Sequence, residues 1–334
     1  MQTVPASSGN AVEATRARNP GIDLLRGLAI VLVVLNHLGL RIPLKQSALA
    51  DVLPPWLLSR LNYNGYEAVF VFFVISGFLI AGNALRRRGS LERIDLRAFY
   101  ARRFARIVPC LLALILVLSV LHLLGVQDYV IHREGQSLPR AIVAALGLHL
   151  NWYEGRTGYL PGMSAIAIGV LGALLAAHWR LPPRRTSGLL GWLGAVGLIA
   201  ATIFGAAMWQ LLRDGYLLLL AVSALCLLLA CEQRQRRGPW QPWRGLGWLR
   251  SWGRLSYEIY LSHMFVVFAV VRIVRLAGGD PRWGHLWYLL ALPLCWLLGK
   301  AVERWLSLPC ERWLRARLLR PRTAAAAPVA MAVD

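Results

Sequence analysis

An arginine and a histidine share one face of the first apolar segment, "GIDLLRGLAIVLVVLNHLGL", at residues 21–40. Arg26 and His37 are eleven residues apart, which is three helical turns plus about 20°, or roughly 16 Å along the axis. Ionisable side chains inside a span are costly and usually face the interior of a helix bundle. One interpretation is therefore a functional pair that faces the interior of the bundle. The alternatives are a positively charged membrane anchor, which is favoured for Arg26 alone, and a hydrogen-bonded core histidine.

Acidic and small residues accompany this pair in the first two apolar segments. Asp23 lies three residues before Arg26 and is placed to pair with it. In "NGYEAVFVFFVISGFLIAGNAL", Glu67 lies near one end and Ser76 and Gly77 interrupt a bulky run. Small residues allow helices to approach closely in membranes, so packing is one interpretation of Ser76 and Gly77. The other is that they leave room for a ligand.

A basic cluster precedes the third apolar segment, in "FYARRFARIVP" at residues 99–109. Arg103 and Arg106 are three residues apart and therefore on one helix face, with Arg102 beside them. Paired guanidinium groups match the oxygens of phosphates, which predicts a phosphate-binding role. Anchoring at the membrane surface or contact with anionic lipid headgroups is the alternative, and it is favoured if the cluster is considered alone.

A second polar stripe leads into the segment "GRLSYEIYLSHMFVVF". Ser256, Tyr260 and His263 follow the spacing i, i+4, i+7 and share one face, with Tyr257 and Glu258 adjacent. Such a stripe can line a functional cavity. It can also serve only as hydrogen bonding between helices.

The elements that must position these residues are membrane-spanning helices. The 334-residue chain is 57% hydrophobic and 16% charged, with a mean hydropathy of +0.51. Soluble domains are about 45–50% apolar and about 25% charged, so we expect an all-α, polytopic transmembrane bundle. We predict about eight spans, at residues 22–40, 64–85, 107–126, 158–179, 188–209, 215–231, 256–276 and 285–303. The apolar stretch 140–152 is too short to cross, and we expect an interfacial or re-entrant helix there.

Basic residues fall in alternate loops, which explains the net charge of +21 better than nucleic-acid binding does. Eight spans put all these loops on one side, with both termini in the cytoplasm. We expect a disordered cytoplasmic tail at 1–20, one membrane domain at 21–318 and a low-complexity tail at 319–334. The five cysteines form no CxxC pair, and we interpret them as small core residues, neither metal ligands nor a disulfide framework.

Four motifs in order resemble the acyltransferase 3 family of membrane acyltransferases, which includes O-acetyltransferases of O-antigen and exopolysaccharide. They are "DLLRGLAIVLVVLNH", "FFVISGFLI", "RRFARIVP" and "SYEIYLSH", and the resemblance covers roughly residues 20–315. It implies transfer of an acyl group, usually acetyl, from cytoplasmic acyl-CoA to a hydroxyl of an envelope glycan or glycolipid. The location implied is the bacterial inner membrane, and no metal is implied.

The resemblance also implies roles for individual residues. His37 would be the base or acyl-handling residue, Arg26 its motif partner, and Arg103, Arg106 and Arg102 the ligands of the CoA phosphates. The remaining candidates would line the cavity or contact the acceptor, and they are Asp23, Glu67, Ser76, Tyr257, Tyr260 and His263.

The middle of the chain departs from the family pattern. Members usually have about ten spans and a W-S-L-x-x-E-x-x-F-Y segment, and neither is found here. A shortened, impaired or inactive member, or a non-enzymatic carrier using the same cavity, therefore stands as the alternative to an active acyl-CoA-dependent O-acyltransferase. A proton-coupled transporter is less consistent with the sequence, because Glu67 and Glu258 lie only near span ends.

Overall fold

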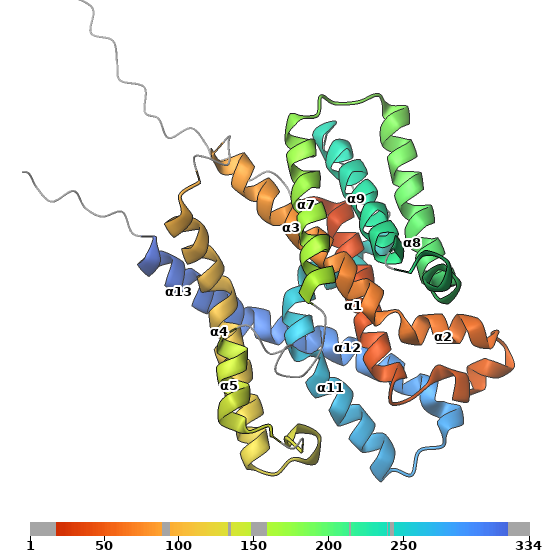
Figure 1. Ribbon diagram of the computed structural model, residues 1–334. Coiled ribbons are helices and arrows are strands. Elements are labelled where there is room, and N and C mark those ends of the chain that lie inside the picture. Colours follow the sequence, from red (N-terminus) through yellow and green to blue (C-terminus); the bar gives the residue numbers. More distant parts are fainter. Residues whose placement is uncertain are drawn as a thin grey trace, which may run out of the picture.

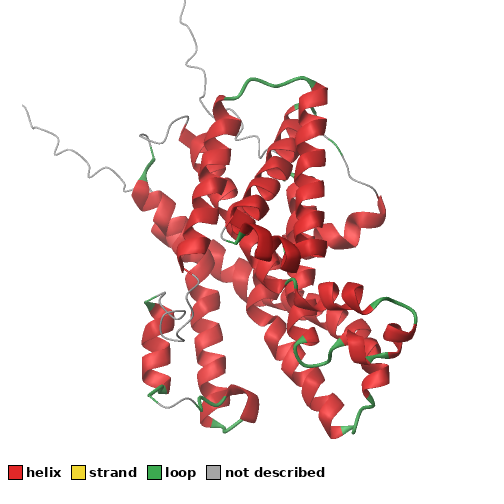
Figure 2. Ribbon diagram, turned by 45° about the vertical axis from the view of Figure 1, so that its right-hand side comes forward, coloured by secondary structure: helices red, strands yellow, loops and turns green. Residues whose placement is uncertain are grey.

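The computed structural model describes residues 18–88, 94–132, 135–147, 159–213, 215–238, 240 and 244–319. Most of the two tails expected at 1–20 and 319–334 lies outside these residues, as does the second half of the stretch 140–152. Helices make up the architecture, and the described part of the chain contains no strand (Figure 2). The all-α prediction is therefore confirmed.

Twelve α-helices are described, and several short turns connect them (Figure 1). The helices are α1 (Pro20–Gly39), α2 (Pro55–Tyr63), α3 (Gly65–Arg88), α4 (Leu96–Leu123), α5 (Leu138–Leu146), α7 (Tyr159–His178), α8 (Arg184–Leu212), α9 (Gly215–Arg236), α10 (Gly247–Arg254), α11 (Ser256–Leu276), α12 (Gly284–Val302) and α13 (Leu308–Leu318).

Seven helical segments of the described chain are long and apolar enough to cross a bilayer. They are α1, α3, α4, α8, α9, α11 and the segment Pro281–Leu318 that contains α12 and α13. The predicted fourth span corresponds to α7, whose described apolar stretch, Gly162–His178, is shorter than the others. All eight predicted segments are thus helical, and seven satisfy the length of a span. Helix α5 has nine residues, or about 14 Å, which is too short to cross.

Two basic segments outside the predicted spans are helical. Helix α4 begins at Leu96, eleven residues before the predicted span, because the Asp95 side chain caps it by accepting from the Ala98 amide at 3.0 Å. The basic stretch after the last span forms α13. The π-helical turn η6 (Glu303–Ser307) joins α13 to α12 without a break. Both segments carry many arginines, which are good helix formers, and polarity alone did not reveal this.

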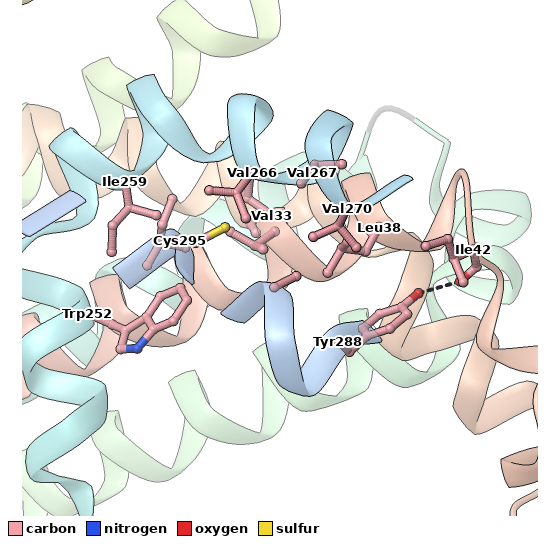
Figure 3. Close-up of a cluster of buried hydrophobic side chains, with 14 of the residues drawn as sticks. Val33, Leu38, Ile42, Trp252, Ile259, Val266, Val267, Val270, Tyr288 and Cys295 are labelled. Carbon is pink, nitrogen blue, oxygen red and sulfur yellow. Dashed lines mark hydrogen bonds between the residues drawn. The ribbon is translucent and has the colours of Figure 1, made fainter. Parts of the chain in front are cut away.

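Helix α1 lies at the centre of the bundle and contributes to both core clusters. One cluster joins α1 to α10, α11 and α12 through Ile30, Leu38, Ile259, Val267 and other fully buried side chains (Figure 3). The second packs α3 against α7 and α9.

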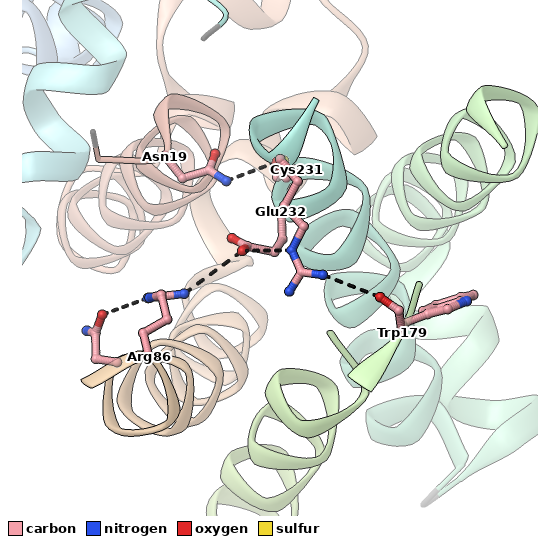
Figure 4. Close-up of polar contacts among 7 residues, drawn as sticks. Asn19, Arg86, Trp179, Cys231 and Glu232 are labelled. Atoms are coloured by element: carbon pink, nitrogen blue, oxygen red, sulfur yellow. Dashed lines mark hydrogen bonds and ion pairs between the residues drawn. The ribbon is translucent and has the colours of Figure 1, made fainter. Parts of the chain in front are cut away.

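Polar contacts close the end of the bundle where α1 begins (Figure 4). Asn19 caps α1 by accepting from the amides of Gly21 and Ile22, and its side-chain amide donates to the Cys231 carbonyl at 2.9 Å. Nearby, Glu232 of α9 lies 3.9 Å from Arg86 of α3 and 3.5 Å from Arg236. These contacts fix the ends of α1, α3 and α9 together.

Two glycine contacts set the separation of neighbouring helices. A Cβ at Gly77 of α3 would collide with the Ile166 carbonyl of α7, and one at Gly169 of α7 would collide with the Val74 carbonyl. Similarly, a Cβ at Gly27 of α1 would meet the backbone of α10, and one at Gly253 of α10 would meet the backbone of α1. Backbones in such contact leave no room for a side chain. Gly77 therefore serves packing, the first of its two interpretations.

Helices α4 and α5 stand apart from this core (Figure 1). Only 11% of the most apolar 18-residue stretch of α4 is buried within the protein, compared with 61% of the corresponding stretch of α3. The main partners of α4 are α13, η6 and α5. Helix α4 is thus attached to the bundle through the α12–α13 segment, while most of its surface is open.

We expect Gly77→Ala to lower the stability of the purified protein by about 1–3 kcal/mol, because the added methyl overlaps backbone. Gly188→Ala in α8 is the matched control, since nothing lies within 4 Å of a Cβ there. It should be neutral or stabilising by up to about 1 kcal/mol through helix propensity. Thermal unfolding in detergent compares the two, and equal Tm values would contradict the packing role of Gly77.

Candidate functional site

The predicted functional residues meet along the contact between α1 and α11. The two helices run in the same direction, because Arg26 and His37 of α1 pair in that order with Ser256 and His263 of α11. Helix α10 packs against both α1 and α11 beside this contact. This line of polar residues along the packed α1–α11 contact, which we call the groove, carries a cation at one end and two imidazoles about 16 Å further along α1.

Arg26 of α1 is held by a hydrogen bond to a residue of another helix, α11. Its Nη2 donates to Ser256 Oγ at 2.7 Å. The predicted partner, Asp23, makes its direct ion pair with Arg18, accepting from Nε at 2.8 Å. It also lies within electrostatic range of Arg26, so the two charges attract without a direct contact between the side chains. The guanidinium of Arg26 remains half-buried between α1 and α11.

His37 and His263 form a pair of adjacent imidazole rings. Their centroids are 5.1 Å apart and the rings are inclined by 47°. His263 is only 3% exposed, and its Nδ1 lies 3.1 Å from the Ile259 carbonyl and 2.8 Å from the Tyr260 carbonyl. Carbonyls accept only, so Nδ1 must carry the proton and Nε2 is the basic nitrogen of the neutral ring. That Nε2 is buried and has no hydrogen-bond partner among the described residues.

The arginines of α4 lie at the Arg26 end of the groove. Arg106 stacks over the Tyr257 ring of α11 with its guanidinium carbon 5.7 Å from the centroid, and it is within electrostatic range of Arg26. Tyr257 also donates to the Ile107 carbonyl at 3.3 Å. Arg103 stacks over Phe99 at 5.4 Å, and Arg102 is half-buried on the same helix. Helices α1 and α4 thus bring Arg26, Arg103 and Arg106 to one end, with Arg106 exposed.

The buried carboxylate of Glu258, which the sequence placed near a span end, also lies at the Arg26 end of the groove. Glu258 is 3% exposed and accepts from Ser307 Oγ at 2.9 Å. It lies within electrostatic range of Arg26. Sequence reasoning missed Ser307, because nothing near it signals the π-helical turn that aims its hydroxyl at α11.

Tyr260 and Ser76, which we predicted to line the cavity, are both exposed in the structure. Tyr260 is 48% exposed, although its ring centroid lies 6.1 Å from that of His263. It sits about 40° around the helix from Ser256, at the edge of the buried face. Ser76 is also exposed, on the same side of α3 as Phe72, which packs against the cluster around α1.

Glu67 lies away from the histidine pair. It faces α8 and α9, where Tyr216 donates to its Oε1 at 3.0 Å. A cavity of about 480 Å³ opens there. Glu67 is therefore not part of the groove between α1 and α11.

Comparisons with known proteins match the first part of the chain. Residues 19–161 match the family model Acyl_transf_3, described as an acyltransferase domain. This range contains Arg26, His37 and the arginines of α4, but not His263. No solved structure matches this chain.

The curated relatives share the same region. "Putative O-acetyltransferase SACOL0978" of Staphylococcus aureus (strain COL) is 31% identical over 134 residues, which is 40% of this chain and 18% of the relative. "O-acetyltransferase OatA" of Staphylococcus aureus (strain NCTC 8325 / PS 47) is 29% identical over the same shares of the two proteins. The match thus spans less than a fifth of the length of these relatives.

The matched range contains the first three motifs, and the fourth, "SYEIYLSH", lies outside it. The multi-pass, all-helical architecture is consistent with a membrane acyltransferase. Residues 19–161 of the chain are therefore similar to the acyltransferase domain of the acyltransferase 3 family of membrane acyltransferases.

Proposed function

We propose that the protein transfers an acyl group, usually acetyl, from acyl-CoA to a hydroxyl of an envelope glycan or glycolipid. It does so in the bacterial inner membrane, with both termini in the cytoplasm. The observation that carries the proposal is the pairing of His37 with His263 in the same groove that has Arg26, Arg103 and Arg106 at its other end. Relatives named as O-acetyltransferases support the reaction class.

The basic end of the groove suits the donor. CoA carries several phosphates, and guanidinium groups bind phosphate oxygens through paired, charge-assisted hydrogen bonds. Arg106 is exposed and Arg103 half-buried, so both can meet a ligand from the aqueous side. With the nucleotide held there, the long arm of CoA extends along α1 and carries the thioester toward His37.

The histidine pair suits proton transfer. In the proposed step His37 removes the proton of the acceptor hydroxyl, and the oxygen attacks the thioester carbonyl. A carbon–oxygen bond forms, the carbon–sulfur bond breaks, and the leaving thiolate takes the proton from the imidazolium of His37. The basic Nε2 of His263 stabilises that imidazolium by accepting from it, while the carbonyls of Ile259 and Tyr260 fix the orientation of the ring.

We expect His37→Ala to reduce acylation of surface glycans about a hundredfold or more, because a positioned base contributes about 10²–10⁴-fold. His263→Ala should give a smaller loss, since its role is to position and stabilise His37. Mass spectrometry of surface glycans from otherwise identical strains measures the acyl increment. His178→Ala is the matched control, since this exposed histidine at the end of α7 bonds only within its helix. Full acylation by the His37→Ala variant, with normal protein levels in the membrane, would show that His37 is not the base.

A second prediction concerns the donor. Arg103→Ala and Arg106→Ala should each weaken acetyl-CoA binding about tenfold or more, because hydrogen bonds between charged groups contribute about 1.5–3 kcal/mol. Binding of acetyl-pantetheine, which has the same acyl arm but no nucleotide phosphates, should be unchanged. Titration calorimetry of the purified protein tests both ligands, with Arg97→Ala, an exposed arginine of the same helix, as control. If both ligands lost affinity equally, the arginines would not be phosphate ligands.

A further inference from the structure

A polar pocket lies on the side of α3 that faces α8 and α9. This cavity, which we name the α3–α8 pocket, measures about 480 Å³, within the range of about 300–1,000 Å³ that small-molecule sites occupy. Its lining residues come from four helices and are Arg60, Tyr66, Glu67, Gly205, Ala206, Trp209, Gln210 and Tyr216. The groove between α1 and α11 does not use them.

A carboxylate oxygen without a partner lies in this pocket. Tyr216 donates to Glu67 Oε1 at 3.0 Å, but Glu67 Oε2 is buried and makes no hydrogen bond with any described residue. Tyr216 itself is 3% exposed, and its hydroxyl also lies 3.2 Å from the Ala201 carbonyl. A buried acceptor without a donor is costly, and native proteins rarely leave one unsatisfied. Glu67 thus has room for a donor from a ligand.

A cation and an aromatic ring flank this carboxylate. Arg60 is half-buried, and no hydrogen bond or ion pair of its guanidinium is found within the described chain. Its charge is near enough to interact with Tyr216. Trp209 is 44% exposed and meets the Tyr216 ring at 83°, with the centroids 6.0 Å apart. Donors, acceptors and an open aromatic surface therefore converge on one space.

The backbone of α8 is shaped to keep the space open. The helix is broken at Phe204 (φ −105°, ψ 18°). Two residues earlier, the Thr202 hydroxyl donates to the Leu198 carbonyl at 2.6 Å. Such back-bonding bends helices. A Cβ at Gly205 would lie 3.1 Å from the Tyr216 hydroxyl and 3.8 Å from Arg60 Nη1. A larger residue at position 205 would narrow the pocket.

The pocket opens at the end of the bundle opposite the arginines of α4. It is formed where α3 begins, where α8 ends and where α9 begins. At this same end Asn36, the neighbour of His37, accepts from the Gly65 amide at 3.3 Å. Gly65 is the first residue of α3, two residues before Glu67. The pocket and His37 are therefore on one side of the membrane, separated by α3.

We propose that the α3–α8 pocket binds an uncharged pyranose unit of the acceptor glycan. A pyranose presents hydroxyls that donate to Glu67 Oε2 and accept from Arg60, and an apolar ring face that packs on Trp209. The opposite charges of Glu67 and Arg60 offset each other, which favours a neutral ligand over an ionic one. The part played in acyl transfer rests on the proposed function. One sugar unit would lie in the pocket, while a neighbouring unit presents its hydroxyl to His37.

Direct binding tests the pocket without any acyl donor. The full chain is purified in a detergent without a sugar headgroup, and methyl β-D-glucopyranoside is titrated by saturation-transfer NMR. Cyclohexyl methyl ether, a ring of similar size without hydroxyls, serves as the comparison ligand. We expect the glucopyranoside to bind and the ether not to bind. Absence of glucopyranoside binding, or equal binding of the two rings, would overturn the proposal.

Variants locate the binding in the pocket. Glu67→Gln keeps the side-chain shape and Trp209→Leu removes the ring, and each should weaken glucopyranoside binding about tenfold or more. The controls are Glu303→Gln and Trp192→Leu, of which Trp192 is 73% exposed on the same helix as Trp209. Unchanged affinity in both pocket variants would overturn the assignment.

A second readout separates this proposal from the acyltransferase reaction. If the protein transfers acyl groups, Glu67→Gln should raise the acceptor KM about tenfold or more and leave acetyl-CoA binding unchanged. If no acyl transfer occurs at all, glucopyranoside binding still reports on the pocket. Loss of acetyl-CoA binding in Glu67→Gln would indicate a structural effect and overturn the role as a subsite.

Discussion

Helices α1 and α10 approach so closely that backbone touches backbone, and the functional groove depends on this approach. Gly27 of α1 and Gly253 of α10 lie against each other, and a methyl group on either would overlap the backbone of the other helix. Ser256 begins α11 two residues after α10 ends, so the position of α10 against α1 decides where Ser256 meets Arg26. In a membrane, where apolar burial gives little drive for helix association, such contacts supply dispersion energy that larger residues would forfeit.

The groove is made from two parallel helices, and this has a chemical use. Because α1 and α11 run in the same direction, their polar residues stay in register, and the groove has two distinct ends joined by one path. Cations gather at one end, and imidazoles lie along the path. Polar groups are costly alone in lipid, and here Arg26 bonds to Ser256 and the two imidazole rings lie against each other across the contact. Helix α4 completes the basic end from outside the core, which leaves that end accessible.

Much of this arrangement could be predicted from local patterns. The apolar lengths gave the helices, and the spacing of Arg26 and His37 placed both on one face. The stripe from Ser256 to His263 predicted a second polar face, and the structure joins the two. Contacts between residues far apart in the sequence could not be predicted from these local patterns. Glu67 is paired with Tyr216, 149 positions away, through the packing of α3 on α9. The ion pair of Asp23 with Arg18 was not predicted, because Arg18 lies in a segment that we expected to be disordered.

The π-helical turn between α12 and α13 has a consequence for how this sequence can change in length. A π turn holds one residue more than an α turn, so losing a single residue from Glu303–Ser307 would leave an ordinary α turn in a continuous helix. Helix α13 would then keep nearly its present orientation against α4. The same loss from the regular part of α12 would instead rotate everything beyond it by about 100°. Ser307 and the side of α13 that supports α4 would then turn away from their partners, which makes the π turn the place where this segment tolerates a change in length.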